Sequence, residues 1–158
     1  MIIYLNSSPN GSLPPPPPTP ENIIFENGVW TLDTYDLVPS VAAPSGFTIS
    51  DNMIISESTS SGRSSGFILL PKDTTTVSKI KILLKGTSNS SSGPYQFGRC
   101  DVDADAYVCA ASGTGRQTFQ EGSLGYEMFR EGSETINPNS AFFVAFGKDL
   151  GIIKISAS

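Results

Sequence analysis

Three groups of side chains have types and spacings that could support chemistry, and the first is a run of alternating carboxylates. Asp101, Asp103 and Asp105 form a D-x-D-x-D pattern, which is how a calcium-binding loop begins. Such a loop needs glycine at its sixth position and glutamate at its twelfth, where this chain has Ala106 and Ser112. Two interpretations stay open, a different calcium site in a β-sandwich and a solvated acidic face. We expect the second, with no metal bound.

The second group is the pair Cys100 and Cys109, the two cysteines of the chain. The residues around them predict a hairpin whose turn is centred on Ala104-Asp105. In that register the two cysteines lie opposite each other, and a disulfide can form if the pair is the close, non-hydrogen-bonded type. The alternative is two free buried thiols, which folding in a reducing cytoplasm favours. A zinc site is not expected, because two sulfurs without histidine cannot complete a tetrahedron.

The third group comprises four glutamates that could supply the paired carboxylates of a glycoside hydrolase: Glu121, Glu127, Glu131 and Glu134. Acids in an acidic chain are usually just solvated, however. The chain has no histidine, which excludes histidine-based triads and histidine metal ligands. The glycine-rich segment 113–116 lacks the lysine of a phosphate-binding loop, so we expect a plain loop there. These patterns together predict a protein that is not an enzyme and uses no cofactor.

Aromatic side chains are the remaining candidate binding groups, because a flat, amphipathic ring can stack on a sugar. The candidates are Trp30, Tyr35, Tyr95, Tyr107 and Tyr126. Trp30 and Leu32 alternate with polar neighbours, which predicts a core position for the indole. Tyr95 follows a Ser-Gly-Pro sequence and is the best candidate for exposure. Phe142, Phe143 and Phe146 lie in a nearly continuous apolar run and are expected in the core.

The composition indicates a loop-rich β protein rather than a helical one. Only 16% of residues are charged, while there are 15 glycines and 12 prolines among many hydroxyl side chains. The net charge is −5, and the ten basic residues are scattered singly. No basic footprint for nucleic acid or anionic lipid is present, so neither is expected as a partner.

The N-terminal part of the chain predicts an arm followed by a stiff linker. Residues 1–13 hold a short apolar segment, Ile2, Ile3, Tyr4 and Leu5, and then turn-forming residues. The apolar segment is too short for a spanning helix or an export signal, so no membrane insertion is expected. We expect these four residues to anchor the chain by adding a strand to a partner or a sister subunit. A strand folded back onto its own domain and a frayed end are the alternatives.

Residues 14–20 contain five consecutive prolines and a further proline at position 20. Such a run favours polyproline II, which over seven residues gives a rod of about 20 Å. A rigid spacer is the favoured interpretation. An SH3-type ligand is the alternative, but no basic residue flanks the run.

Residues 21–158 predict one domain of short strands separated by turn signals such as Asn27-Gly28 and Asp51-Asn52. The expected strands cover residues 22–26, 29–32, 35–38, 46–50, 53–56, 66–70, 78–85, 95–102, 106–111, 125–129, 141–146 and 152–156. We expect eight to ten of them to persist in an all-β, antiparallel two-sheet sandwich that is jelly-roll-like and preceded by the extended N-terminal arm.

The layout of segment 1–5, linker 14–20 and β-rich remainder resembles bacteriophage virion accessory proteins. These include capsid decoration proteins, head fibres and tail appendages, in which a short N-terminal segment docks to the particle and a β-sandwich is displayed. The resemblance implies a virion protein assembled in the host cytoplasm, other virion proteins as partners, and a homo-oligomer, with a trimer favoured. No functional residue carries over, because the likeness lies in the layout of the chain.

Two functions are therefore expected, in this order. The first is a structural display protein of a phage particle, anchored by its arm, with a host-surface glycan as a further candidate partner. The second is a secreted carbohydrate-binding, lectin-like module, which would share only the domain and not the arm's role.

Overall fold

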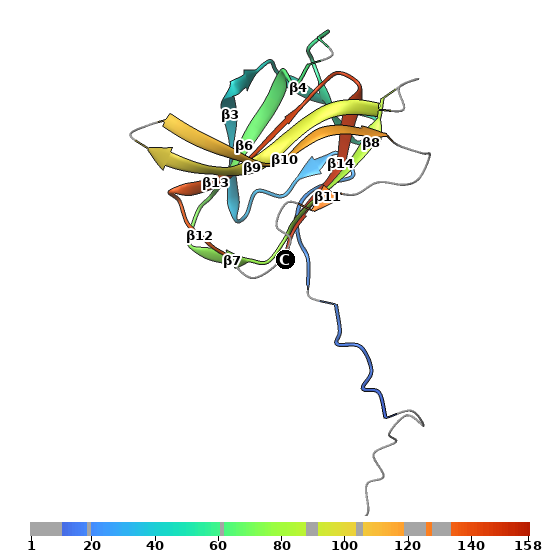
Figure 1. The fold of residues 1–158 in the computed structure, drawn as a ribbon, viewed down its shortest axis with the longest axis vertical. Helices are drawn as coiled ribbons and strands as arrows, with labels where there is room; N and C mark the ends of the chain where they lie inside the picture. Colours follow the sequence, from blue (N-terminus) through green and yellow to red (C-terminus); the bar gives the residue numbers. More distant parts are fainter. Residues whose placement is uncertain are drawn as a thin grey trace, which may run out of the picture.

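Antiparallel strands form the domain, and no helix occurs in the part of the chain that the structure describes (Figure 1). The computed structural model describes residues 11–18, 20–60, 62–87, 92–103, 106–118, 126–127 and 134–158. Within these residues no helix is long and apolar enough to cross a membrane. The predicted fold class, an all-β antiparallel sandwich, is confirmed.

Two large sheets and one small ribbon hold the strands. The first sheet contains β1 (Asn22–Glu26), β2 (Val29–Trp30), β4 (Phe47–Ser50), β5 (Met53–Ser56), β8 (Ile80–Gly86), β11 (Tyr126–Glu127) and β14 (Leu150–Ala157). The second contains β3 (Tyr35–Pro44), β6 (Ser65–Pro71), β9 (Ser92–Asp103), β10 (Ala106–Thr118) and β13 (Ser140–Phe146). The ribbon pairs β7 (Thr75–Val77) with β12 (Glu134–Ile136).

The strand order is that of a jelly roll. The first sheet contains the order β1-β14-β8-β11, and the second contains β6-β13-β9-β10. When these eight strands are numbered along the chain, the two orders become 1-8-3-6 and 2-7-4-5, the arrangement of a double Greek key. The remaining strands β2, β3, β4 and β5 extend the sheets at their edges.

Two tight hairpin turns follow from the local sequence. In the β1–β2 turn, Asn27 and Gly28 have φ values of 54° and 78°. In the β4–β5 turn, Asp51 and Asn52 have φ values of 51° and 63°. Positive φ at both central positions is the type I′ geometry, which matches the twist of paired strands. Both turns were predicted from these dipeptides, and both predictions are confirmed.

The core lies between the two large sheets. Its largest fully buried side chains include Phe25 and Ile82 from the first sheet and Phe67, Phe142 and Phe146 from the second. Trp30 packs partly buried against this core, with its ring centroid 4.9 Å from that of Phe25.

Alternation along β13 places Phe143 in a second, smaller cluster with Ile68 and Ala141. The predicted core positions of the three phenylalanines are confirmed, and Trp30, also predicted in the core, lies partly buried at its edge.

Two local predictions were wrong. Segment 113–116 was expected to be a loop but belongs to β10, where Gly113 to Arg116 pair with Phe97 to Pro94 of β9. The long strand β9 provides the pairing partners for this segment, and a bulge between Ala111 and Gly113 shifts the register by one residue. The ribbon strands β7 and β12 were missed, because each has only three residues and gains its order from the other.

Residues 11–18 form no strand, are exposed, and extend away from the sandwich (Figure 1). They include the five consecutive prolines, and the preceding Leu13 is 91% exposed. The opposite end of the chain is built into the sheet, because β14 lies between β8 and β1. The Ser158 carbonyl accepts hydrogen bonds from the amides of Ser78 and Lys79.

Candidate functional site

The predicted anchoring residues Ile2, Ile3, Tyr4 and Leu5 lie outside the described residues. The structure does describe the arm root, residues 20–22, where the N-terminal segment joins the sandwich. Glu21 accepts a hydrogen bond from Lys154 of β14, with 2.9 Å between Oε2 and Nζ. The same ammonium lies 3.5 Å from Oε1 of Glu26 in β1. Lys154 therefore ties the residue before β1 to the central strand of the sheet.

The charges at this root shift each other's protonation. The hydrogen bond from Lys154 lowers the pKa of the Glu21 carboxyl, although desolvation opposes it. The hydrogen bond to Glu21 raises the pKa of Lys154, and the charge of Glu26 adds to the effect. Beside this ion pair, Asn22 donates a hydrogen bond of 2.8 Å from Nδ2 to Oγ1 of Thr34.

A small hollow of about 230 Å³ opens at the same root, lined by Pro20, Asn22, Tyr35, Thr75, Thr76, Val77, Ala157 and Ser158. Tyr35 is 1% exposed, and burial raises the pKa of its hydroxyl to about 12. The arm thus leaves the sandwich beside the ribbon strand β7 and the last residues of β14.

The predicted hairpin register around the cysteines is confirmed. β9 and β10 pair Asp103 with Ala106, and the register continues to Cys100 opposite Cys109. The side chains of these strands around the turn lie outside the description, so the disulfide stays a prediction. Asp105 also lies outside the described residues. Among the side chains that the structure does describe, no cluster of three or more potential metal ligands occurs.

The remaining sequence candidates do not gather into one site within the described part. Tyr95, the best candidate for exposure, is 4% exposed, and its ring stacks on Phe97 with centroids 5.7 Å apart. Tyr95 is therefore not an exposed binding group, because the strand begins at Ser92 and carries Tyr95 into the core. The side chains of Tyr107, Tyr126, Glu127 and Glu134 are not described, and Glu121 and Glu131 lie outside the description altogether.

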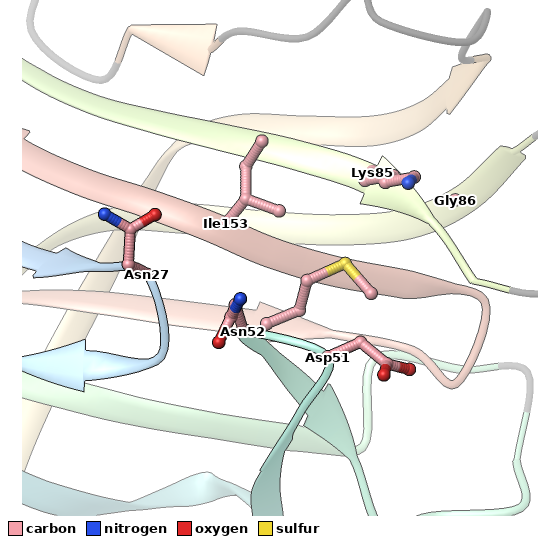
Figure 2. A pocket seen from close by; sticks show the side chains of 7 residues that line it. Asn27, Asp51, Asn52, Lys85, Gly86 and Ile153 are labelled. Atoms are coloured by element: carbon pink, nitrogen blue, oxygen red, sulfur yellow. The ribbon is translucent and has the colours of Figure 1, made fainter.

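A larger pocket of about 530 Å³ lies where the two type I′ turns approach the end of β8 and the middle of β14 (Figure 2). It is lined by Asn27, Asp51, Asn52, Met53, Lys85, Gly86 and Ile153. We call these residues the turn pocket. In Figure 2, Asn27 lies on one side of the pocket, and Asp51 and Lys85 lie on the other. Ile153 and Asn52 stand between them.

Two structural irregularities shape the turn pocket. In the pairing of β14 with β8, Ile152 and Lys154 face consecutive residues, so Ile153 is the extra residue of a bulge. The two turns also lie against each other, since a Cβ on Gly28 would be 3.1 Å from Oδ1 of Asn52. Glycine at position 28 therefore leaves room for the Asn52 side chain.

The turn pocket was not predicted, although its turns were. Asn27, Asp51 and Asn52 were interpreted only as turn formers, which they are. Their convergence depends on which strands pair: β14 bonds to β5 through Gly151 and Ile152 and to β1 through Lys154. A carboxamide or carboxylate at three of the four positive-φ turn positions is the one local signal that could have drawn attention to them.

Comparisons of the chain with protein-family models, with curated proteins and with solved structures gave no match.

Proposed function

We propose that this protein is a structural display protein of a phage particle, anchored by residues 1–13 and exposing the β-sandwich for capsid or tail decoration. The observation that carries the proposal is the exposed proline segment, which projects from a sandwich into which the other end of the chain is firmly paired. Polyproline is a semi-rigid spacer, so it sets a minimum distance between an anchor and a displayed domain.

The construction of the arm root supports this role. A tether transmits force or torque to the first residue that is fixed in the domain. Here Glu21 and Glu26 bond to Lys154 in the middle of the sheet, and Asn22 bonds to Thr34. Load on the arm would therefore pass into the central strand β14 rather than into an edge strand.

The fold is compatible with the display role. Jelly rolls form viral capsid domains and lectin domains, and the fold alone does not choose between them. The proposal assigns no catalysis, and a homo-oligomer, with a trimer favoured, completes it. Analytical ultracentrifugation of the full chain tests that part, and a monomer at all concentrations would contradict it.

The decisive experiment is sedimentation of the native protein from its source through a density gradient, followed by mass spectrometry. We expect the protein in a particle band, together with capsid or tail proteins. Recovery only as a small, slowly sedimenting species would overturn the proposal.

Variants of the arm then test the anchor. Ile3→Asp with Leu5→Asp should abolish particle association and leave the thermal unfolding midpoint of the domain unchanged. Ser7→Asp with Ser8→Asp adds the same charge beyond the apolar segment and is the matched control, which should still associate. If both double variants associate with particles equally well, residues 2–5 are not the anchor.

The second candidate, a secreted carbohydrate-binding module, is favoured by the turn pocket. A polar pocket open to solvent is what such a module needs, and particle display does not require one. The two functions are compatible, because a displayed domain can also bind a host glycan. The density-gradient experiment separates them, since a secreted module would not travel with particles.

A further inference from the structure

We infer that the turn pocket is a binding site for glycans that contain N-acetylhexosamine. This inference names the ligand and the site of the displayed domain, and it rests on the proposed function only for the biological setting. The binding itself is a property of the sandwich and can be measured apart from any particle.

The polar side chains of the turn pocket have no hydrogen-bonding partner among the described residues. Asn27, Asp51, Asn52 and Lys85 are exposed, and none has a side-chain hydrogen bond or ion pair to another residue that the structure describes. Together they offer two carboxamides, one carboxylate and one ammonium around a single hollow. A ligand with several hydroxyl and amide groups can therefore bond to them without displacing a side-chain hydrogen bond between described residues.

The β4–β5 turn carries side chains where glycine would be less strained. Positive φ at both central positions is most easily met by Asn-Gly or Asp-Gly. This turn has Asn52 at the second position, with φ of 63°. The neighbouring β1–β2 turn does use glycine there, and Asn52 packs into the space that Gly28 leaves. Asn52 is thus a residue with a strained backbone whose side chain lines the pocket. In proteins, backbone strain tends to be found at functional sites.

The chemistry of the lining matches an N-acetylated sugar. Met53 and Ile153 supply apolar side chains that the acetamido methyl group can contact. The carboxamides of Asn27 and Asn52 can each donate and accept, as the acetamido N–H and C=O require. Asp51 and Lys85 provide an acceptor and a donor for neighbouring ring hydroxyls. The volume of about 530 Å³ falls within the range of about 300–1,000 Å³ that small-molecule sites occupy.

The position of the pocket suits a displayed domain. Asn22, at the start of β1, lines the hollow at the arm root, and Asn27, just beyond its end, lines the turn pocket. The two positions are five residues apart along an extended chain, a distance of about 16 Å. The pocket therefore lies toward the end of β1 that is remote from the arm.

The test is titration of the purified full chain, free of particles, with N,N′-diacetylchitobiose, followed by amide chemical shifts. We expect saturable shifts at residues 27, 51–53, 85–86 and 153. Cellobiose has the same linkage without the acetamido groups and should bind at least about tenfold more weakly, the ratio that 1.4 kcal/mol represents. Absence of shifts with diacetylchitobiose, equal binding of cellobiose, or shifts confined to other residues would each overturn the inference.

Asn52→Gly is the sharpest variant, because it separates binding from folding. It removes a pocket side chain and also relieves the positive-φ residue, so the unfolding midpoint should be kept or raised. Binding should weaken about three- to tenfold, as for the loss of one hydrogen bond. Lys85→Met should weaken binding similarly, while Lys148→Met, an exposed lysine outside the pocket, should not. Unchanged binding in both pocket variants would remove this surface as the site.

The two proposals fail separately. If the protein does not associate with particles but still binds the sugar, only the proposed display role is contradicted. If it associates with particles but does not bind the sugar, only the glycan site in the turn pocket is contradicted.

Discussion

Cys100 lies directly opposite Cys109 in the antiparallel pairing of β9 with β10. This is the register that the intervening sequence predicts for a turn centred on Ala104-Asp105. Directly opposed residues in an antiparallel pair have Cα atoms about 4.5–5.5 Å apart, within the range of a disulfide. The pairing of the backbones therefore makes the bond sterically available.

The first prediction concerns this bond. Protein purified without reductant should resist thiol alkylation, because in oxidising solution the two opposed sulfurs close a bond. Cys100→Ser with Cys109→Ser should then lower the free energy of unfolding by about 2–3 kcal/mol, as expected for a short closed loop. Intact-mass spectrometry and denaturant unfolding provide the measurements. In reducing buffer the variant and the parent protein should agree, and two alkylated thiols after full oxidation would refute the bond.

The second prediction concerns the arm root. Lys154→Met removes the contacts to Glu21 and Glu26, and it should cost about 0.2–1 kcal/mol per exposed pair. The pKa of Glu21 is lowered, so its contribution is lost as pH falls below 4.5. The pKa of Lys154 is raised, so its contribution is present below pH 10.5 and is lost as pH rises through the folded value.

The difference in stability between parent and Lys154→Met should therefore be largest between pH 4.5 and 10.5 and shrink at both extremes. Thermal unfolding across pH is the measurement, and added salt should also reduce the difference. Lys148→Met is the control and should change nothing. A difference that does not depend on pH would show that Lys154 acts through packing.

The third prediction concerns Tyr35. Burial raises the pKa of its hydroxyl to about 12, so the unfolded chain ionises first as pH rises above 10. Stability should fall from that pH upward, by about 1 kcal/mol at pH 11 from this residue alone. Tyr35→Phe should remove this loss and remain stable at neutral pH, because the ring still lies 6.1 Å from Phe142 between centroids. Denaturant unfolding of both proteins on either side of pH 10 measures it, and equal alkaline losses would refute it.

The fourth prediction concerns the close approach of strands at Gly66. A Cβ there would lie 2.5 Å from the Val144 carbonyl oxygen and 2.9 Å from Cβ of Ala43. Because the first neighbour is backbone of a paired strand, Gly66→Ala should destabilise the domain by about 1–3 kcal/mol or more. Gly62→Ala is the matched control, since its nearest neighbour is Oγ of Ser60 at 3.4 Å. Equal unfolding midpoints for the two variants would contradict this account.

Serine side chains show how the polar loop after β5 is ordered by local bonds. The hydroxyls of Ser56, Ser58 and Ser60 each accept a hydrogen bond from the amide two residues ahead. Ser65 then joins Ser56 at 2.7 Å between hydroxyl oxygens and donates to the Gly46 carbonyl. The serine-rich composition thus satisfies backbone donors where no strand partner is available.

Much of the fold follows from the sequence by itself, because short-range geometry decides it. Asn27-Gly28 and Asp51-Asn52 specify type I′ turns, and strands β1 and β5 begin and end where the pattern places them. In β8 the aliphatic side chains of Ile80, Ile82 and Leu84 alternate along the strand, and all three are buried. These features depend on φ preferences and on a side-chain period of two, which neighbouring residues determine.

Tertiary structure alone decided which surfaces meet. Tyr95 is buried because β9 pairs with β13 and places Phe146 opposite it, and Gly113 to Arg116 are strand because β9 extends beside them. The turn pocket exists because β14 pairs first with β5 and then with β1, which brings the two turns together at Ile153. Partner choice between strands far apart in the chain depends on the packing of the whole core, and a local pattern carries no information about it.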